Sequence, residues 1–584
     1  MKSFLKTFLA VVLAQIFLGL WGVLLLMGFI AVAISGTTEI PEHCYLVQSV
    51  GGEIPEYVPP MTLSPFDDAP PNHTSLLENL EKAGADDRIR GVVLEVWPSD
   101  LGMGKRDEIR QRIRQLRERG KSVYAFGRYL TTMDYYMVSG CDSILVTPDG
   151  LIELHGLALE AQFFKGTLDG VGVNPNIHQI AEFKSAAESI TRRDLSDEAR
   201  ENAQWLLDDI FKSLVTTISA DRGLSEDTLL AAMELAQLNP SMAFERGLVD
   251  GLVYWEDLET LLGADDVWKT VDGKDYVKVE RKDVGLSGPK RIAIVHAQGV
   301  IGSGDNGYAF PFGLKMGSGA MTRALNDVRK DTGIHGVILR VDSPGGSSIA
   351  SDDISYAVKL LNEEKPTVVS MVDMAASGGY MISYRCSTIV ALPNTLTGSI
   401  GSITGKFNAK GMYDHLGVTK DFVTVGPRPL INSDYHDFTE EEWEIVRSRH
   451  WSAYDSWVKQ VAEWRGLELS ELDSLARGRV WTGQQAMERR LVDHVGGFDV
   501  AMVALKEDLG IPPGQDVKIV HLPEPRTFLE QLLEDGNFTG WKGRMLLALS
   551  RLFFGSSSPL RTWMPELEIA DPAMIDGAWL WRIR

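Results

Sequence analysis

The chain has 584 residues, of which 44% are hydrophobic and 24% are charged, and this composition is typical of a globular protein with more than one domain. Its formal net charge of −22 at pH 7 argues against a phosphate-binding surface, so we expect no nucleic-acid partner. Three cysteines are too few for a disulfide framework, and because no cysteine or histidine cluster has metal-ligand spacing, we expect no metal and no other cofactor.

The N-terminal segment is strongly apolar. Residues 7–38 contain no charged side chain, and residues 8–33 are dense in Leu, Val, Ile, Phe and Ala. About 20 such residues are enough for a helix to cross a bilayer, whereas a cleaved signal peptide, the alternative, has an apolar core of only about 7 to 15 residues. We therefore predict that residues 1–38 form a cytoplasmic tip and one transmembrane helix. Lysines precede this span and acidic residues follow it, so the rest of the chain should lie outside the cytoplasm.

The remainder of the chain is built around a tandem duplication. The sequence of residues 89–96 is closely repeated in residues 334–341, and that of residues 141–148 in residues 386–393. In both cases the second segment lies 245 positions after the first. One long offset indicates two related domains and not a short-period solenoid. The predicted divisions are a Pro-rich lead-in, a first repeat, a connecting segment, a second repeat and a C-terminal extension: residues 39–72, 73–254, 255–288, 289–509 and 510–584.

Helical and strand patterns alternate in both copies. Apolar strands that are separated by helices indicate a largely parallel sheet with both faces covered, so the predicted fold class is α/β. The predicted first helix, first strand and second strand are residues 76–83, 91–96 and 123–126 in one copy and residues 320–329, 336–341 and 367–372 in the other. A long helix late in each copy begins after Ser196 or Thr439 and ends at Arg-Gly-Leu, where glycine can adopt the left-handed cap conformation.

The copies differ just after the first strand. Gly345 and Gly346 follow this strand in the second copy, whereas Asp100 and Leu101 stand in their places in the first. Two consecutive glycines allow backbone amides to turn toward a developing oxyanion. An ordinary strand-to-helix turn is the alternative interpretation of this pair.

A second difference follows the next strand. Ser377 lies among small residues at the expected start of a helix, and its counterpart in the first copy is Thr132, among bulkier neighbours. A serine in this position can expose its hydroxyl while the next amide points at the same place. Ser377 could instead cap the helix, but together with the two glycines the pattern favours a nucleophile.

A serine nucleophile needs a base, and no histidine lies near either motif. His296 and His335 fall in or beside strand patterns, whereas Lys184 in the first copy corresponds to the neighbourhood of Arg428 in the second. Arginine does not deprotonate in a protein, but a buried lysine can act as a base once its pKa falls from about 10.4 toward 7 or 8. We therefore expect Lys184 at a buried interface between the copies, with a solvated surface lysine as the alternative.

Together these motifs resemble the long form of the signal peptide peptidase A, or protease IV, family of Ser/Lys peptidases, family S49. The matching segments are residues 182–196, 342–347, 374–380 and 396–402. The resemblance implies a duplicated Clp protease/crotonase-like spiral of ββα units. It also implies that Ser377 is the nucleophile and Lys184 the general base, that Ser399 orients the lysine, and that the amides of Gly378 and of Gly345 or Gly346 hold the oxyanion. The family pattern Lys-Ser-Ala-Val-Glu-Pro is replaced here by residues 184–189, KSAAES.

The resemblance further implies a setting for this site. It predicts a bacterial-type inner-membrane protein with a periplasmic catalytic part, which forms a homotetramer and degrades cleaved signal peptides and other apolar peptides. Two other functions stay open on the sequence: an acyl-CoA enzyme of the crotonase type, and an inactive scaffold that binds membrane proteins.

Overall fold

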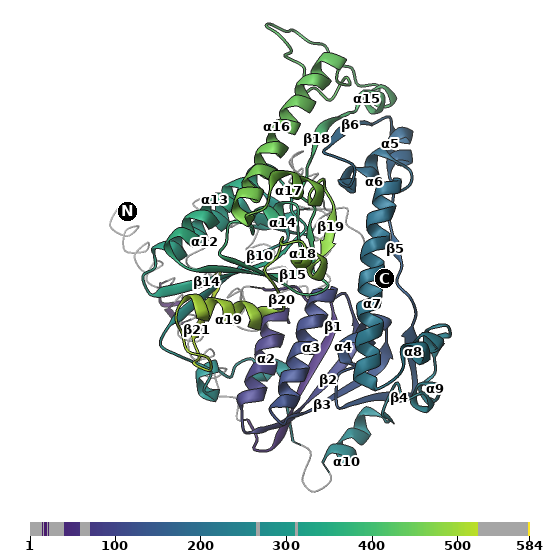
Figure 1. Ribbon diagram of the computed structural model, residues 1–584, viewed down its shortest axis with the longest axis vertical. Helices are drawn as coiled ribbons and strands as arrows, with labels where there is room; N and C mark the ends of the chain where they lie inside the picture. The colour runs from purple at the N-terminus through teal and green to yellow at the C-terminus, as the bar shows by residue number, and fades with distance from the viewer. Residues whose placement is uncertain are drawn as a thin grey trace, which may run out of the picture.

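The computed structural model describes residues 15, 17–19, 21–22, 40–58, 71–263, 269–309, 313–523 and 582–583. In this part of the chain no helix is long and apolar enough to span a membrane. Most of the predicted transmembrane segment, residues 1–38, lies outside the described residues. The predicted α/β class is confirmed, since the described chain forms two large sheets covered by helices (Figure 1).

The two large sheets have the same strand arrangement. The first has the order β7-β4-β3-β2-β1-β9 with β8 beside β4, and the second has the order β19-β17-β15-β14-β10-β21 with β16 beside β15 and β20 beside β16. Pairing is parallel except between β4 and β7 and between β17 and β19. The first sheet comprises β1 Cys44–Gly52, β2 Ile89–Ser99, β3 Ser122–Leu130, β4 Ser143–Leu154, β7 Ala236–Leu238, β8 Gly251–Leu252 and β9 Thr270–Asp272. The second comprises β10 Arg291–Gln298, β14 Ile334–Ser343, β15 Thr367–Ala376, β16 Thr388–Ala391, β17 Leu396–Gly398, β19 Val480–Thr482, β20 His494–Val495 and β21 Lys518–Leu522.

Smaller strands complete the structure. A three-stranded sheet and two two-stranded sheets lie outside the large ones. Their strands are β11 Val300–Gly302, β12 Gly307–Ala309 and β13 Gly313–Gly317 in the first, β6 Asn174–Gln179 and β18 Ile403–Asn408 in the second, and β5 Leu159–Glu160 and β22 Arg582–Ile583 in the third.

Helices cover the sheets in the predicted order. In the first repeat and the connecting segment they are α2 His73–Ala85, α3 Met103–Glu118, α4 Thr132–Val138, α5 Lys165–Val171, α6 Glu188–Thr191, α7 Asp197–Arg222, α8 Glu226–Met233, α9 Pro240–Glu245, α10 Leu258–Leu262 and α11 Gly273–Tyr276, with short 3₁₀ turns at Ser185–Ala187, Trp255–Asp257 and Arg281–Val284. In the second repeat they are α12 Ser318–Lys330, α13 Ser348–Glu364, α14 Gly378–Met381, α15 Lys410–Leu416, α16 Glu440–Arg465, α17 Leu469–Leu475, α18 Gly483–Glu488 and α19 Phe498–Asp508.

The predicted ends of the two long helices are confirmed. Ser196 caps α7 by accepting from the amide of Ala199, and Thr439 begins α16 with a capping box. Gly223 and Gly466 end these helices with φ angles of 63° and 61°, the left-handed conformation that glycine adopts at little cost.

Both sheets extend beyond the predicted repeats. β1 lies in the segment predicted as a lead-in, β9 lies in the connecting segment, and β21 lies in the C-terminal extension. Each of these strands pairs in parallel with a neighbour that is distant in sequence, and such pairing leaves no local signal comparable to a hairpin turn.

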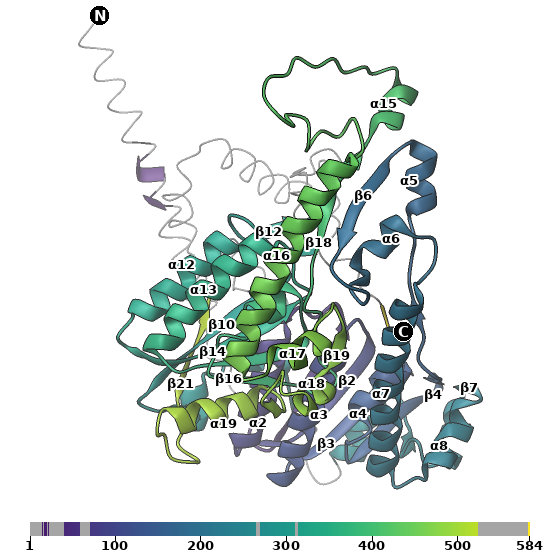
Figure 2. The same cartoon turned by 45° about the horizontal axis from the view of Figure 1, so that its top comes forward.

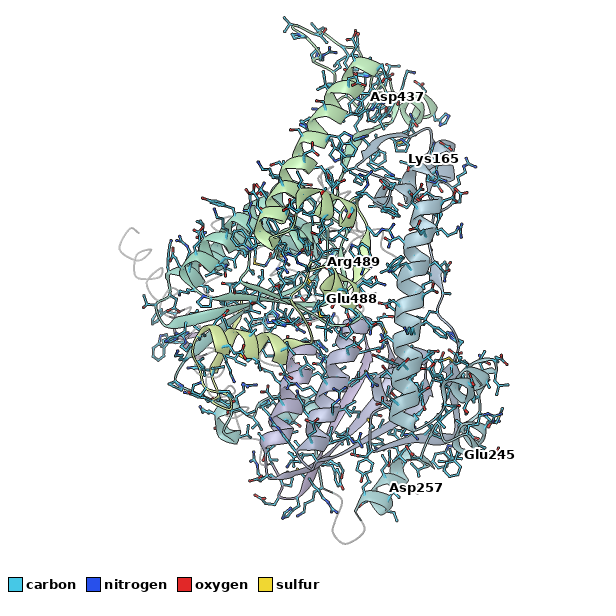
Figure 3. The ribbon with its side chains drawn as sticks, viewed as in Figure 1. Lys165, Glu245, Asp257, Asp437, Glu488 and Arg489 are labelled. Atoms are coloured by element: carbon cyan, nitrogen blue, oxygen red, sulfur yellow. The ribbon has the colours of Figure 1, made fainter. Side chains whose placement is uncertain are left out.

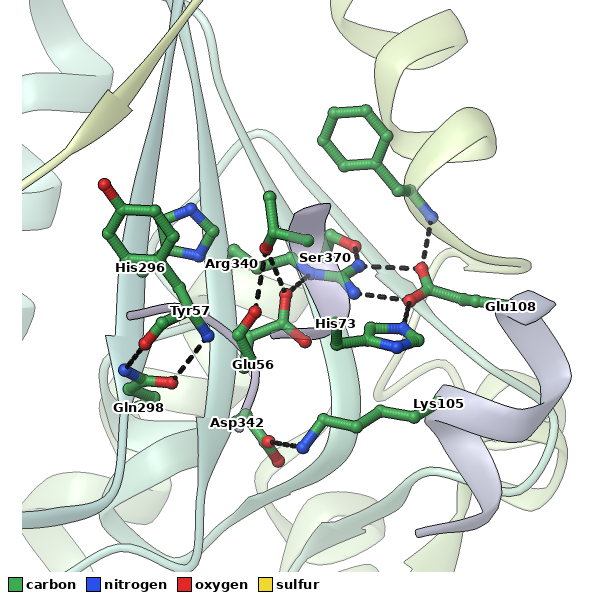
Figure 4. Close-up of polar contacts among 12 residues, drawn as sticks. Glu56, Tyr57, His73, Lys105, Glu108, His296, Gln298, Arg340, Asp342 and Ser370 are labelled. Carbon is green, nitrogen blue, oxygen red and sulfur yellow. Dashed lines mark hydrogen bonds and ion pairs between the residues drawn. The ribbon is translucent and has the colours of Figure 1, made fainter. Parts of the chain in front are cut away.

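A charged helix, α3, is buried where the two repeats meet, in contact with β3 of the first and β15 of the second. Opposite it, Arg340 of β14 is only 2% exposed. Its guanidinium donates to Glu108 of α3 at 2.8 Å, to Glu56 at 2.7 Å and to Ser370 at 2.9 Å (Figure 4). Burial alone would raise the pKa of Glu108, but Arg340 and His73 hold it well below its usual range. The repeats are therefore joined by paired buried charges.

The repeats also meet through strands β6 and β18, which pair antiparallel. Asp437 holds this pair together, because its carboxylate accepts from the side chains of Asn174 and Asn408 at 2.9 Å and of Asn176 at 2.6 Å. Figure 3 shows Asp437 at the opposite end of the molecule from Asp257. Lys184 follows β6 by a few residues, so this pairing fixes the path of the chain toward it.

We predict that Arg340→Met lowers the free energy of unfolding by about 3–5 kcal/mol, because it leaves two carboxylates buried without their cation. Urea unfolding followed by circular dichroism measures the loss. The control is Lys410→Met, which removes an exposed ion pair with Asp414 and should leave the urea midpoint unchanged. Equal midpoints for wild type and Arg340→Met would show that the buried pairs do not hold the repeats together.

Candidate active site

Ser377 lies in a strained turn between β15 and α14. Its φ and ψ angles are 54° and −115°, a region that non-glycine residues rarely occupy and that is often found at functional sites. The turn is held by the Ser377 amide, which donates to the carbonyl oxygen of Gly398 at 2.9 Å. The side chain makes no capping hydrogen bond to α14, so the alternative of a helix cap is wrong.

Lys184 reaches this serine from the first repeat. Its Nζ lies 2.9 Å from Ser377 Oγ, 3.1 Å from Ser399 Oγ and 3.2 Å from the Ser399 carbonyl oxygen. The residue is 2% exposed, as expected for a lysine at an interface between the copies, and the alternative of a solvated surface lysine is wrong. The structure thus brings together three of the side chains that the sequence singled out.

A tight turn of the second repeat holds Lys184 in place. Gly478 has a φ of +82°, and a Cβ at this position would lie 2.5 Å from Lys184 Cα. On either side, Arg477 pairs with Glu182 at 2.8 Å, and Arg479 stacks over the ring of Phe183 at 3.7 Å. Only a glycine allows the backbones to approach this closely, so Gly478 sets the position of the lysine.

The same turn positions Ser399. The Ser399 amide donates to the carbonyl oxygen of Arg479 at 2.8 Å, and the Gly478 amide donates to that of Ile400 at 2.8 Å. Ser399 itself has a φ of 51°. These contacts leave its hydroxyl within hydrogen-bond distance of the lysine.

The two glycines after β14 lie beside the Ser377 turn. Gly345 and Gly346 have φ angles of 99° and 152°, and a Cβ on Gly345 would lie 2.6 Å from the Gly378 nitrogen. The Gly345 amide donates to Ser343 Oγ at 3.2 Å. By contrast, no acceptor in the described part of the chain takes the amide hydrogen of Gly346 or Gly378. These two nitrogens are neighbours, since a Cβ on Gly378 would lie 3.2 Å from Gly346 N, so Gly346 and Gly378 are the available pair of donors.

Sequence reasoning missed Lys105, which connects α3 to strands β14 and β15. Its Nζ lies 2.8 Å from Asp342 at the end of β14 and 3.2 Å from Asp373 near the end of β15. The Lys105 amide also donates to Asp373 at 2.9 Å, so a carboxylate of the second repeat caps a helix of the first. Burial favours the neutral amine, but the two carboxylates raise the pKa of Lys105, so it stays charged.

Two glycines make this docking possible. A Cβ on Gly102 would lie 2.2 Å from the Asp373 carboxyl carbon, and one on Gly104 would lie 2.5 Å from the carbonyl oxygen of Val372. Two glycines at the start of a charged helix are a sequence sign of close packing at that point. Because the residues they contact, Val372 and Asp373, lie far away in the sequence, the glycines alone do not reveal what packs there.

The other basic residues named in the search for a base lie elsewhere. His296 is buried at the junction of the repeats, where its Nε2 lies 3.0 Å from His521 Nδ1. Arg428 contacts Glu441 at 3.3 Å on the surface. In the described part of the chain neither residue forms a hydrogen bond or ion pair with Ser377, so the chemistry available at this site is that of a serine hydroxyl beside a lysine amine.

Comparison with known proteins agrees with this chemistry. The model of peptidase family S49 matches twice, at residues 115–267 and 359–511. The chain is 32% identical to serine protease SPPA, chloroplastic, of Arabidopsis thaliana, covering 78% of this chain and 69% of that protein. It is also 32% identical to protease 4 of Haemophilus influenzae, covering 72% and 71%. A putative signal peptide peptidase SppA of Enterococcus faecium is 32% identical over 43% of this chain and 71% of its own.

These matches define a serine peptidase with a duplicated catalytic fold. The chain belongs to peptidase family S49, so the resemblance noted in the sequence is confirmed.

We predict that Gly478→Ala lowers kcat about 100-fold, because the added methyl group displaces Lys184 by a fraction of an ångström or more. Hydrolysis of a quenched peptide measures kcat. Gly514→Ala is the matched control, since Gly514 has the same φ of +82° but a Cβ there meets nothing within 4 Å. Equal activity in the two variants would show that Gly478 does not position the lysine.

We predict that Lys105→Met lowers kcat about 10- to 100-fold and changes KM much less, because β14 and β15, which lead to Gly346 and Ser377, lose their common ion-pair partner. Lys105→Arg should recover part of the rate. The control is Lys82→Met, which removes another buried lysine whose Nζ donates to the carbonyl oxygen of Val279 at 2.9 Å, remote from the site. If kcat per folded molecule falls equally in both variants, Lys105 has only a structural role.

Proposed function

We propose that this serine peptidase is an endopeptidase whose catalytic dyad is Ser377, the nucleophile, and Lys184, the general base. The observation that carries the proposal is the 2.9 Å separation of Lys184 Nζ and Ser377 Oγ across the junction of the repeats. Such a distance suits direct proton transfer. Ser399 orients the lysine through the contact at 3.1 Å.

The catalytic cycle follows from these positions. Neutral Lys184 takes the proton of Ser377 as the serine oxygen attacks a peptide carbonyl carbon. The amides of Gly346 and Gly378 stabilise the oxyanion. Of the two glycines after β14, Gly346 is the proposed donor because the Gly345 amide already donates to Ser343 Oγ. Protonated Lys184 then protonates the leaving amine, and water hydrolyses the acyl-enzyme by the reverse sequence of proton transfers.

The substrates proposed are cleaved signal peptides and other apolar peptides. The name of the Enterococcus faecium relative, a putative signal peptide peptidase, supports this substrate class. The apolar residues 8–33 support a membrane anchor, with the catalytic part on the periplasmic side of a bacterial-type inner membrane. We further propose that each repeat has the Clp protease/crotonase-like spiral architecture and that the protein acts as a homotetramer.

Family membership favours this function over the two alternatives. A crotonase-type acyl-CoA enzyme has no need of a lysine at 2.9 Å from a serine hydroxyl, and an inactive scaffold would not need the Ser377 turn to remain strained. The buried Ser-Lys contact is therefore the feature that separates peptidase from scaffold.

We predict that Ser377→Ala and Lys184→Met each lower the hydrolysis of a quenched apolar peptide by at least about 10³-fold in the full-length protein in detergent. Lys184→Arg should be equally inactive, because a guanidinium stays protonated. A serine-directed acylating probe should label wild type at Ser377, and its labelling should fall in Lys184→Met.

Thr132→Ala is the matched control, because Thr132 stands in the first repeat where Ser377 stands in the second. It should hydrolyse the peptide at the wild-type rate. Hydrolysis retained by Ser377→Ala or by Lys184→Met would refute the dyad, and a wild-type protein that takes up no probe and cleaves no peptide would favour the scaffold.

A further inference from the structure

Two residues that precede α2, Glu56 and Tyr57, form a strap across the second sheet, where β21, β10 and β14 lie side by side (Figure 2). Glu56 pairs with Arg340 of β14, and the Tyr57 ring stacks on the ring of His296 in β10 at a centroid distance of 4.0 Å (Figure 4). The Tyr57 amide donates to Gln298 Oε1 at 3.0 Å, and Gln298 Nε2 donates to the Tyr57 carbonyl oxygen. The strap therefore ties the start of the first repeat to the second.

A small cavity lies beside the strap, at the junction of the repeats. Its volume is about 30 Å³. A buried water needs about 10–15 Å³, so the cavity has room for water. Arg112 and Arg281 both pair with Glu81 there, and Arg340 pairs with Glu56 and Glu108. The charged side chains that line the cavity are Glu56, Glu78, Glu81, Arg112, Arg281 and Arg340.

A chain of hydrogen bonds runs from Glu78 toward this cavity. His521 Nε2 lies 3.0 Å from Glu78 Oε1, and His521 Nδ1 lies 3.0 Å from His296 Nε2. Beyond it, His296 Nδ1 and Glu56 Oε2 are buried without a hydrogen-bond partner in the described part of the chain. Both residues line the cavity and are only 4% and 2% exposed. These four side chains form a relay with a gap at its inner end.

The hydrogens of the relay can be counted. Burial alone would raise the pKa of Glu78, but His521 and Arg281 hold it below its usual value, so Glu78 is ionised and only accepts. His521 therefore donates from Nε2, and when neutral it accepts at Nδ1 from His296 Nε2. This leaves His296 Nδ1 and Glu56 Oε2 as two bare acceptors on one cavity. Two neutral imidazoles thus supply two hydrogens, whereas joining all four side chains takes three.

We infer that the relay is a proton-binding site, in which one proton completes the link between His296 and Glu56 through a water in the cavity. The entering proton binds His296 Nδ1, and the hydrogen on His296 Nε2 moves to His521 Nδ1. The positive charge then rests on His521 beside Glu78. His296 stays neutral and donates through the water to the Glu56 carboxylate, so each link holds one hydrogen.

The charges around the relay favour this distribution. Burial, together with the charges of His521 and Arg340, keeps the pKa of His296 well below its usual range, so His296 does not hold the charge. His521 is better placed, because its side chain is 19% exposed and has the Glu78 carboxylate at 3.0 Å. Buried acceptors without a partner destabilise a fold. The folded protein therefore binds this proton more tightly than the unfolded chain does.

Uptake of the proton strengthens the contact between the strap and the second repeat. Because the folded state binds the proton more tightly, the added stability is complete below about pH 6.5, the ordinary value for histidine, and is lost as the pH rises above it. The relay contains neither Ser377 nor Lys184. It is thus a pH-sensitive device of the junction that is separate from the proposed dyad.

The pH dependence of stability tests this inference. Urea unfolding of the full-length protein in detergent, followed by circular dichroism, is compared at about pH 8 and about pH 6. Between these values the unfolding equilibrium constant of wild type should fall about tenfold more than that of Glu56→Gln, because the glutamine amide supplies the third hydrogen without a proton. His521→Phe should lose the same pH dependence, because it removes the ring that holds the charge.

Glu81→Gln is the matched control, because Glu81 lines the same cavity but lies outside the relay. It should be less stable at both pH values and keep the wild-type pH dependence. Equal pH dependence in wild type and Glu56→Gln would place the proton on His521 and Glu78 alone and overturn the relay. An equal loss in Glu56→Gln and Glu81→Gln would overturn it as well, since the charge of the cavity would then explain the effect. Persistence of the pH dependence in His521→Phe would exclude His521 as the group that holds the proton.

Discussion

Helix α3 is rich in charged side chains and is buried between the two repeats, so its buried charges need partners of opposite charge. The guanidinium of Arg340 forms ion pairs with Glu56 and Glu108. The ammonium of Lys105 forms ion pairs with Asp342 and Asp373. A buried charge without its partner costs several kcal/mol, so the repeats have few ways to dock that satisfy all of these groups. These buried ion pairs therefore fix how one repeat docks on the other. The same docking places Lys184 of the first repeat beside Ser377 of the second.

Duplication allowed the two repeats to diverge at matching positions. The second keeps glycines after its first strand and places Ser377 after its second, whereas the first has Asp100, Leu101 and Thr132 at these places. The turn after β2 in the first repeat packs, through Gly102, against Asp373 in β15 of the second. Under the proposed dyad each copy supplies one catalytic side chain, Lys184 from the first and Ser377 from the second.

Much of the fold followed from local patterns, because capping residues, apolar strands and left-handed glycines act on their immediate neighbours. Ser377 was recognisable for the same reason, and Lys184 was found by comparing the copies. What the sequence left open depends on tertiary contacts: the inclusion of β1 and β21 in the sheets, the hydrogen bond that occupies the amide of Gly345, and the ion pairs of Lys105. Parallel pairing and buried ion pairs have no signature within a short window.

The tight turn around Gly478 affects the order in which the site can assemble during synthesis. Lys184 precedes Ser377 by 193 residues in the chain, and the turn that orients the lysine comes later than both. A ribosome delivers these parts in order, and domains generally fold as they emerge. A nascent chain therefore carries a folded first repeat and then a serine, but no assembled site until the segment that contains Gly478 has been synthesised. The order of synthesis therefore delays the meeting of Lys184 and Ser377 until most of the second repeat has left the ribosome.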